Sequence, residues 1–309
     1  MNEFQLIKKY FAPLSLNNKG SFNLTDDIFF DYKKKIGISI DTYIEKIHFL
    51  NFKKPDLVIK KILRASLSDL LCKGLHPKYY FISASGNKNH FTKSNLIKIN
   101  KILKSEQKKF SIKISGGDTV LSNKLSFTII VVGYAKNKPI LRNNAKENDD
   151  IYVTNYLGDP YLGLKILQSK KKIQYYKYFV KSFFSTNIPY EFSQKLFLFA
   201  NSSIDISDGL YQDLNHIMSN SKLNYKLFEK KIPISNKLKQ YLNSKKLNKN
   251  NFISKGDDYQ ILFTANKNKN ELIKRIAKKT NTLVTKIGVV VKNKLKKGHK
   301  SQGYIHKFS

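Results

Sequence analysis

The apolar run at residues 125–134 constrains the fold of this chain more than any other stretch. It reads Leu-Ser-Phe-Thr-Ile-Ile-Val-Val-Gly-Tyr, and its β-branched and aromatic side chains predict a β-strand. Because the run is nearly unbroken in its apolar character, the strand must be buried or paired on both sides. The chain therefore needs a sheet that holds this strand in its interior.

Strands and helices alternate along the whole sequence. In the first half, strands are predicted at 28–30, 36–42, 79–84 and 110–114, and helices at 2–11, 55–73 and 93–104. In the second half, strands are predicted at 151–154, 224–228 and 283–291, and helices at 160–168, 172–184, 190–200, 235–245 and 269–279. A polar segment at 139–150 separates the halves. The pattern predicts an α/β (α+β) fold with two domains, residues 1–145 and 146–309.

The composition is typical of a folded protein that works inside the cell. Apolar residues make up 41% of the 309 residues, and no apolar run is long enough to predict a membrane span. The start of the sequence lacks the basic and apolar regions of a signal peptide. Cys72 is the single cysteine, so an internal disulfide is excluded. These features predict a cytoplasmic location and no membrane partner.

The formal net charge of +35 raises the question of nucleic-acid binding. Of the 57 basic residues only Arg64, Arg142 and Arg275 are arginines, whereas proteins that read bases or phosphates in a bidentate way favour arginine. The lysines are also spread along the whole chain. We therefore expect no specific nucleic-acid partner, although the charge should attract anionic substrates. A lysine-rich RNA-binding protein on an inactive enzyme scaffold is the alternative from a different class.

A pair of aspartates marks the corner between a predicted strand and a predicted helix. Residues 203–206 alternate between polar and apolar side chains, and apolar residues recur at helical spacing from Leu210 onward. The helix is therefore predicted to begin near Asp208 or Gly209. At such a corner the carboxylates of Asp205 and Asp208 suit a hard divalent cation such as Mg2+. The alternative is that Asp208 is only a helix N-cap and Asp205 a solvated loop residue.

Further aspartates stand at predicted strand ends or beside turns. They are Asp26-Asp27, Asp41, Asp69, Asp118 and Asp257-Asp258. The chain has only 22 acidic residues, so this placement is unusual for a solvated surface. Carboxylates that converge repel one another unless divalent cations lie between them, and Mg2+ that bridges phosphate oxygens is the usual reason for such a cluster. The sequence has no P-loop motif, so nucleotide chemistry would depend on carboxylate-held metals.

Two of these aspartates have informative neighbours. Asp118 follows Gly116 and Gly117, which predicts a sharp turn where the backbone approaches a ligand. Asp69 interrupts the apolar side of the predicted helix at 55–73, where a carboxylate is costly unless a cation or hydrogen bonds compensate it. Gly-Gly-Asp alone is a common turn sequence and only weakly predicts a binding site, whereas the Asp69 carboxylate needs a compensating partner.

Taken together, these residues resemble thiamine-monophosphate kinase, within the superfamily that includes aminoimidazole ribonucleotide synthetase and selenophosphate synthetase. The resemblance runs along nearly the full chain in the right order. It is carried by Asn2-Glu3-Phe4-Gln5-Leu6-Ile7, Asp26-Asp27, Ser39-Ile40-Asp41, His48-Phe49, Leu67-Ser68-Asp69, Gly116-Gly117-Asp118-Thr119, Arg142, Ala145-Lys146, Tyr152-Val153-Thr154, Leu157-Gly158-Asp159, Asp205-Ile206-Ser207-Asp208-Gly209-Leu210, Gly256-Asp257-Asp258-Tyr259 and Gly303-Tyr304.

The resemblance implies transfer of the γ-phosphoryl group of ATP to thiamine monophosphate, giving thiamine diphosphate and ADP. It implies direct in-line attack by the acceptor phosphate, assisted by Mg2+. It also implies a two-domain synthetase-like fold, in which an N-terminal mixed sheet forms a barrel across a homodimer and an α/β domain follows. The N-terminal domain would bind ATP and Mg2+ and form the dimer.

The resemblance also implies a set of site residues. Several Mg2+ ions would be held by Asp27, Ser39, Asp41, Asp69, Asp118, Asp205 and Asp208, of which Asp118, Asp205 and Asp208 would be catalytic. ATP would be contacted by Gly117, Asp118, Arg142 and Ser207. Thiamine monophosphate would be lined by His48, Asp257 and Tyr304, with Tyr304 offering an aromatic face.

The sequence departs from the family pattern at several positions. Ile40 replaces a usual hydroxyl residue, which removes one possible ligand beside the metal. Lys255 and Asp257 stand where the family usually has glycine and glutamate, and Thr25 and Asn155 each replace a glycine. These departures bear on substrate preference. An aminoimidazole ribonucleotide synthetase-like ligase is therefore the enzymatic alternative.

Overall fold

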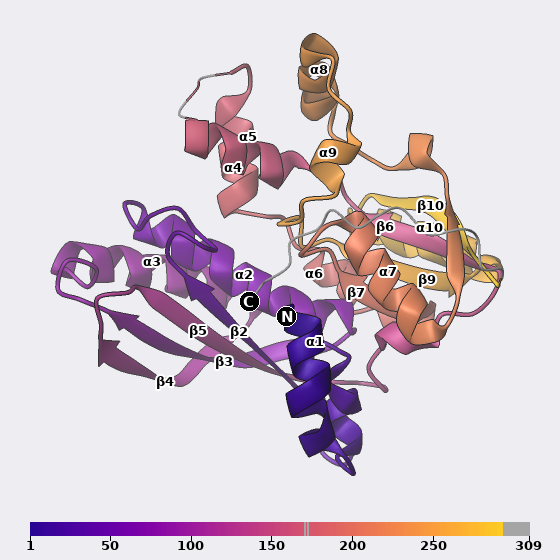
Figure 1. Ribbon diagram of the computed structural model, residues 1–309, viewed down its shortest axis with the longest axis horizontal. Coiled ribbons are helices and arrows are strands. Elements are labelled where there is room, and N and C mark those ends of the chain that lie inside the picture. Colours follow the sequence, from indigo (N-terminus) through magenta and orange to yellow (C-terminus); the bar gives the residue numbers. More distant parts are fainter. Residues whose placement is uncertain (170, 172, 293–309) are drawn as a thin grey trace.

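The computed structural model describes residues 1–169, 171 and 173–292, and places them in two lobes that each contain a five-stranded sheet (Figure 1). Strands and helices are mixed in both lobes, which confirms the predicted α/β fold. All strands of the first sheet precede residue 145 and all strands of the second follow it. The domain boundary proposed at 145/146 stays a prediction.

The first sheet is mixed, and its central strand is the apolar run. Its order is β1 (Phe29–Asp31), β2 (Ile36–Ile44), β5 (Ser126–Tyr134), β3 (His76–Gly86) and β4 (Lys113–Leu121). Strand β5 pairs antiparallel with both β2 and β3, whereas β3 and β4 are parallel. The prediction that the apolar strand is paired on both sides is therefore confirmed.

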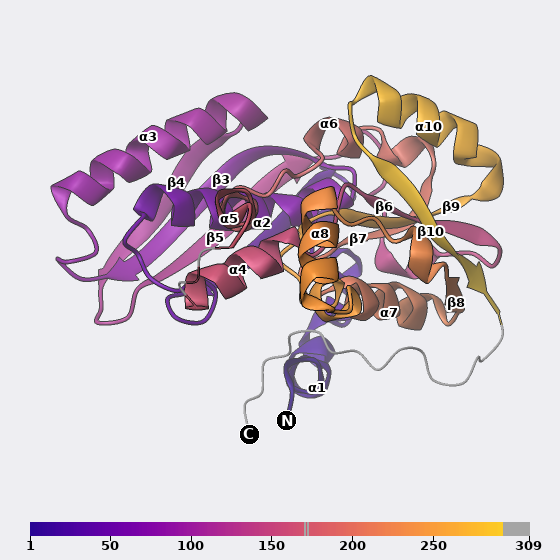
Figure 2. The ribbon, with the colours of Figure 1, turned by 90° about the horizontal axis from the view of Figure 1, so that it is seen from above.

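Two long helices cover one face of this sheet. Helix α2 (Pro55–Cys72) packs on β2 and β5, and α3 (Lys93–Phe110) packs beside α2 (Figure 2). The alternate residues Phe127, Ile129 and Val131 of β5 share a buried cluster with the apolar side of α2. No helix of the described chain covers the other face of this sheet, and the Ile40 side chain on that face is 64% exposed.

The second sheet is covered on both faces. Its order is β7 (Ala200–Asp205), β9 (Ile261–Asn266), β6 (Asp149–Thr154), β10 (Val284–Val291) and β8 (Asn224–Leu227), and neighbouring strands are antiparallel. Ile151 and Val153 of β6 pack in one core with α7 (Leu210–Ser221). Tyr152, which points the other way, packs in a second core with α10 (Asn270–Lys279). Figure 2 shows these helices on opposite sides of the sheet.

The remaining helices are short. α4 (Asp159–Ser169), α5 (Tyr176–Phe184), α8 (Asn236–Lys245) and α9 (Asn250–Ile253) form a small apolar core of their own. The chain begins with α1 (Glu3–Leu6), which opens with a reciprocal capping box between Asn2 and Gln5 and continues as a π-helical turn, Ile7–Phe11. In the described part of the chain, no helix combines the length and the apolar character needed to cross a membrane.

Three secondary-structure predictions differ from the structure. The strand predicted at 110–114 begins only at Lys113, because α3 continues to Phe110. The predicted helix at 190–200 is a short helix α6 (Tyr190–Ser193) and a 3₁₀ turn, because Ala200 already pairs with Ala265 in the second sheet. The predicted turn at Gly116 and Gly117 is part of strand β4. A Cβ atom at Gly117 would lie 1.9 Å from the carbonyl oxygen of Ile82 on β3, so this glycine allows a close approach of two strands.

Helix α2 also joins the two lobes. Cys72 at its end lies in the same buried cluster as Tyr152 and Phe263 of the second sheet. The Ser203 hydroxyl of β7 donates a hydrogen bond to the Cys72 carbonyl, and the Lys73 ammonium donates to the Ser203 carbonyl at 2.9 Å. The end of α2 therefore lies at the junction where aspartates from both lobes can meet.

Candidate active site

Aspartates from four separate segments meet at this junction. Asp27 precedes β1, Asp41 lies on β2, Asp69 lies on α2 and Asp205 ends β7. A carboxylate oxygen of Asp27 and one of Asp205 lie within 4.8 Å of each other and of the Cys72 sulfur. The charges of Asp41 and Asp205 both act on Asp69. We call these four residues the carboxylate cluster.

Helix α2 carries hydroxyl groups that bind the cluster. The Ser68 hydroxyl donates to Asp205 Oδ2 at 2.7 Å. The Tyr43 hydroxyl donates to Asp41 Oδ2 at 2.9 Å and forms a hydrogen bond with the Ser66 hydroxyl at 3.0 Å. These contacts fix Asp41 and Asp205 against one side of the helix, which explains why polar residues interrupt an otherwise apolar helix.

The alternation of β2 decides which of its residues face the cluster. Ser39 is buried on the side that packs against α2, where its hydroxyl lies 3.5 Å from the Ser66 carbonyl, and Asp41 lies on the same side. Ile40 points to the opposite, open face. Within one chain the side chain of residue 40 therefore faces away from the carboxylates, and the loss of a metal ligand at Ile40 stays a prediction.

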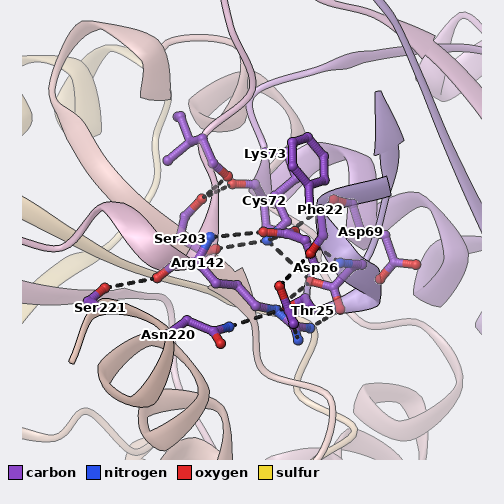
Figure 3. A network of polar contacts seen from close by, with 12 residues as sticks. Phe22, Thr25, Asp26, Asp69, Cys72, Lys73, Arg142, Ser203, Asn220 and Ser221 are labelled. Atoms are coloured by element: carbon purple, nitrogen blue, oxygen red, sulfur yellow. Dashed lines mark hydrogen bonds and ion pairs between the residues drawn. The ribbon is translucent and has the colours of Figure 1, made fainter. Parts of the chain in front are cut away.

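Two cations already lie beside the first aspartate pair (Figure 3). The Lys73 ammonium lies 2.8 Å from Asp26 Oδ1 and 3.2 Å from Asp27 Oδ2. The Arg142 guanidinium binds both oxygens of Asp27. The backbone N–H of Arg142 donates to Asp26 Oδ2 at 2.9 Å. Both aspartates are thus held by these cations, and Asp27 also approaches Asp205 in the cluster.

The corner after β7 differs from a simple helix cap. The N-cap of α7 is Gly209. Its φ of +117° favours glycine, and the Cβ of any other residue at this position would clash with the Ser254 backbone. The backbone N–H groups of Asp208 and Gly209 donate to Asp213 Oδ2 at 3.2 and 3.1 Å, and Asp208 accepts from Gln212 at 2.9 Å. Asp205 is 3% exposed. The alternative in which Asp208 is the N-cap and Asp205 is solvated is therefore wrong.

Burial makes the carboxylates of this region hard to ionise. Burial and the charges of Asp41 and Asp205 raise the pKa of Asp69 well above its usual value. Burial also raises the pKa of Asp41 and Asp205, although hydroxyl donors oppose the rise. Burial raises the pKa of Asp208 to about 7, and the charge of Asp205 adds to the effect. A divalent cation would relieve this repulsion, and the oxygen donor set fits a hard ion such as Mg2+.

Proton release should accompany Mg2+ binding. A carboxyl group with a raised pKa keeps its proton below that pKa and must lose it to bind a cation, so Mg2+ affinity should fall as pH drops from 8 to 6. Calorimetry in two buffers of different ionisation enthalpy measures the protons released. Asp208→Asn should release fewer protons than the wild type, whereas Glu271→Gln on α10 should not differ from it. Equal heats in both buffers would contradict the prediction.

The loop that carries Asp257 is attached to the same corner. Asp257 N–H donates to the Ser207 carbonyl at 2.9 Å, and Tyr259 N–H donates to the Ile206 carbonyl at 2.8 Å. The Asp257 carboxylate accepts from the Tyr259 hydroxyl at 3.0 Å and forms an ion pair with Lys61 of α2. The loop therefore places Asp257 beside α2, about two helical turns before Asp69.

Of the other two predicted substrate residues, only His48 lies in the described part of the chain. His48 packs edge-on against Tyr43 with ring centroids 5.8 Å apart, and its Nδ1 accepts from the Ile44 N–H at 3.0 Å. It is therefore linked to Asp41 through Tyr43. Tyr304 lies outside the described residues.

Asp118 is not brought to the cluster within one chain. The register of the first sheet aligns Asp41 with Ile129, Ile129 with Ile82, and Ile82 with Gly117. Three strand spacings therefore separate Asp118 from Asp41, which is about 14 Å. Asp118 is exposed on strand β4, where its carboxylate accepts from the Thr119 N–H at 2.8 Å.

Comparison with known proteins identifies the family. A family model described as AIR synthase related protein, N-terminal domain, matches residues 25–135. The thiamine-monophosphate kinase of Buchnera aphidicola subsp. Schizaphis graminum is 33% identical over 308 residues, which cover 94% of this chain and 91% of that protein. The chain belongs to the thiamine-monophosphate kinase family.

Other members of the thiamine-monophosphate kinase family agree in sequence and fold. The Haemophilus influenzae protein is 30% identical over 297 residues, covering 94% of this chain and 89% of that protein. The structure of AaThiL complexed with AMPPCP and TMP matches with a TM-score of 0.87 at 25% identity, over 99% of this chain and 97% of that chain. The HypE–HypF complex, at 17% identity and a TM-score of 0.75, shares the fold. The predicted family is confirmed.

Four residues that contact this site were not predicted from the sequence of this thiamine-monophosphate kinase family member. They are Tyr43, Lys61, Lys73 and Asp213. Helical spacing is the signal that could have found two of them, because Lys73 follows Asp69 by four residues and Lys61 precedes it by eight, about two turns earlier on α2. Asp213 lacks such a signal, because an acid in the first turn of a helix is common.

Proposed function

We propose that this chain transfers the γ-phosphoryl group of ATP to thiamine monophosphate, forming thiamine diphosphate and ADP. The buried carboxylate cluster between the lobes, in a chain of the thiamine-monophosphate kinase family, is the observation that carries the proposal. The match to AaThiL complexed with AMPPCP and TMP supports the same nucleotide and the same acceptor.

The cluster would hold the metal that phosphoryl transfer needs. Mg2+ would be bound by Asp27, Asp41, Asp69 and Asp205, with Asp208 beside them. When bound, it would neutralise charge on the transferring phosphoryl group. Arg142 and Ser207 would contact the phosphates of ATP. The acceptor phosphate is already anionic, so the protein needs to position the reactants more than it needs to remove a proton.

The acceptor would lie where Asp257 and His48 approach α2. Lys61 binds the Asp257 carboxylate and also lies 4.2 Å from the Phe183 ring centroid and 5.3 Å from that of Tyr259. These contacts hold the Asp257 carboxylate in one place. A fixed carboxylate would suit the cationic thiazolium of thiamine monophosphate.

A homodimer would complete the site. Strand β4 pairs with β3 alone among the described strands and leaves Ile114, Val120 and Leu121 exposed, while Ile40 lies on the open sheet face. An uncovered edge strand and an apolar sheet face are features that a second copy would cover. Asp118 lies on this same edge. We therefore infer that Asp118 and Gly117 serve the cluster of the partner chain.

The direct test is thiamine diphosphate formation from ATP and thiamine monophosphate, measured by chromatography with and without Mg2+. We expect turnover that requires Mg2+ and stops in EDTA. Turnover with formylglycinamidine ribonucleotide in place of thiamine monophosphate would instead favour the aminoimidazole ribonucleotide synthetase alternative. Salt-sensitive RNA binding without any ATP turnover would favour an RNA-binding role on an inactive scaffold.

A further inference from the structure

Lys73, at the end of α2, places a buried ammonium beside the carboxylate cluster. Its side chain has no exposed surface, and its Nζ is surrounded by three oxygens. They are Asp26 Oδ1 at 2.8 Å and the Ser203 carbonyl at 2.9 Å (Figure 3), and Asp27 Oδ2 at 3.2 Å. An ammonium has three N–H donors, so each can be matched to one of these acceptors.

The surroundings keep this lysine charged. Burial is the largest single influence and lowers the pKa of Lys73, but the electrostatic effects of Asp26, Cys72 and Asp205 together outweigh it, so the pKa is raised. A buried charge is costly unless it is paired, and here the ammonium is paired with two carboxylates at once. The Lys73 side chain therefore places an ammonium group between Asp26 and Asp27, with an acceptor for each of its three N–H groups.

The oxygens around Lys73 are also the kind that bind a hard metal ion. Two carboxylates and a backbone carbonyl are typical ligands of a divalent cation, and none of the three acceptors is a sulfur or a ring nitrogen. The same Asp27 carboxylate approaches Asp205 in the cluster. The ammonium thus occupies a cation position at the edge of the predicted Mg2+ site.

We propose that Lys73 is a resident counter-cation that takes the place of one metal ion between Asp26 and Asp27. This inference rests on the proposed metal site. Asp41, Asp69 and Asp205 are then the main carboxylates left to bind Mg2+, with Asp27 shared between them and Lys73. Removing the ammonium should create a further Mg2+ site, because Asp26 then lacks its ion-pair partner and Asp27 keeps only the Arg142 guanidinium.

The test counts Mg2+ ions and does not depend on catalysis. In Lys73→Ala the space of the side chain is vacated, and equilibrium dialysis should find one more Mg2+ bound per chain than in the wild type. In EDTA the Tm of this variant should fall by about 10 °C, because one partner of a buried ion pair is removed. Saturating Mg2+ should recover most of that loss, and should raise the Tm of the wild type less.

Two further variants separate this role from that of an ordinary buried ion pair. Lys61→Ala removes another buried lysine of α2 from its partner Asp257, so it should also lower Tm but should bind the wild-type number of Mg2+ ions. Asp26→Asn combined with Lys73→Ala removes the carboxylate as well, and should return the Mg2+ count to that of the wild type.

Three results would contradict the proposed role of Lys73. An unchanged Mg2+ count in Lys73→Ala would overturn it, and so would a Lys73→Ala protein that stays unfolded in saturating Mg2+, since the ion could then not replace the ammonium. An additional ion that persists in the double variant would also overturn it, because Asp26 would not be its ligand. A wild-type chain inactive as a kinase would refute the proposed function without changing these counts.

Discussion

Asp205→Asn is expected to lower kcat for thiamine diphosphate formation by about a thousandfold or more. The change keeps the size of the side chain and an oxygen that can still accept from the Ser68 hydroxyl. It removes a negative charge from the centre of the carboxylate cluster, where the proposed Mg2+ would be held. The loss should therefore come from charge and not from packing.

The same change should leave the metal-free protein as stable as the wild type or more stable. Burial raises the pKa of Asp205 in the folded protein, so at pH 8 the ionised carboxylate opposes folding, and this effect fades as pH falls through the raised pKa. Asparagine carries no charge and avoids that effect. Thermal unfolding in EDTA at pH 8 measures it, and Tm should not fall.

Ser68→Ala is the matched control for Asp205→Asn. It removes the hydrogen bond to Asp205 but keeps the carboxylate, so turnover should drop far less than in Asp205→Asn. If Asp205→Asn kept more than about a tenth of the wild-type kcat, Asp205 would not hold the metal on which transfer depends.

Mixed dimers of Asp118→Asn and Asp205→Asn should recover activity that neither variant has alone. If each site uses Asp205 of one chain and Asp118 of the other, a mixed dimer contains one site without any substitution. At random pairing of equal amounts, half of the dimers are mixed and each has one of its two sites intact. The mixture should therefore show about a quarter of wild-type turnover.

The register of the first sheet is the reason to expect this recovery. Asp118 lies about 14 Å across the sheet from Asp41, on an exposed edge strand. It cannot share an ion with the cluster of its own chain at that distance. Co-expression of two differently tagged chains, followed by purification on both tags, isolates the mixed species for assay.

A second mixture controls for this experiment. Asp69→Asn mixed with Asp205→Asn should recover nothing, because both residues belong to the cluster of the same chain and every site keeps one substitution. Verified mixed dimers of Asp118→Asn and Asp205→Asn without recovered turnover would refute the placement of Asp118 in the partner's site.

Much of the fold could be predicted from the sequence because its signals are local. The apolar character of 125–134 predicted a central strand, and helical spacing predicted α2 to within a residue. The corner between β7 and α7 was visible in the change of periodicity near Asp208. The helix predicted at 190–200 was wrong because the apolar residues there lie in a short helix and a 3₁₀ turn that pack on the second sheet, and the pairing of Ala200 with β9 is a long-range contact.

The candidate site was predictable in its residue types but not in its geometry. A costly aspartate within an apolar helix indicated that Asp69 needs partners. The sequence could not show that Lys73 points at Asp26, since those residues lie 47 positions apart and meet only when α2 packs beside the segment before β1. Strand alternation places Ile40 and Asp41 on opposite faces of the sheet, but the sequence could not show which of these faces holds the cluster.

The sequence by itself determined the family, the α/β pattern and the supply of aspartates at strand ends, because each depends on residues that are neighbours in the chain. Only the tertiary structure decided which carboxylates share a site, which are neutralised by Lys73 and Arg142, and which one lies apart on an edge strand. These outcomes depend on strand order and on helix packing, which bring distant residues within the few ångströms over which buried charges act.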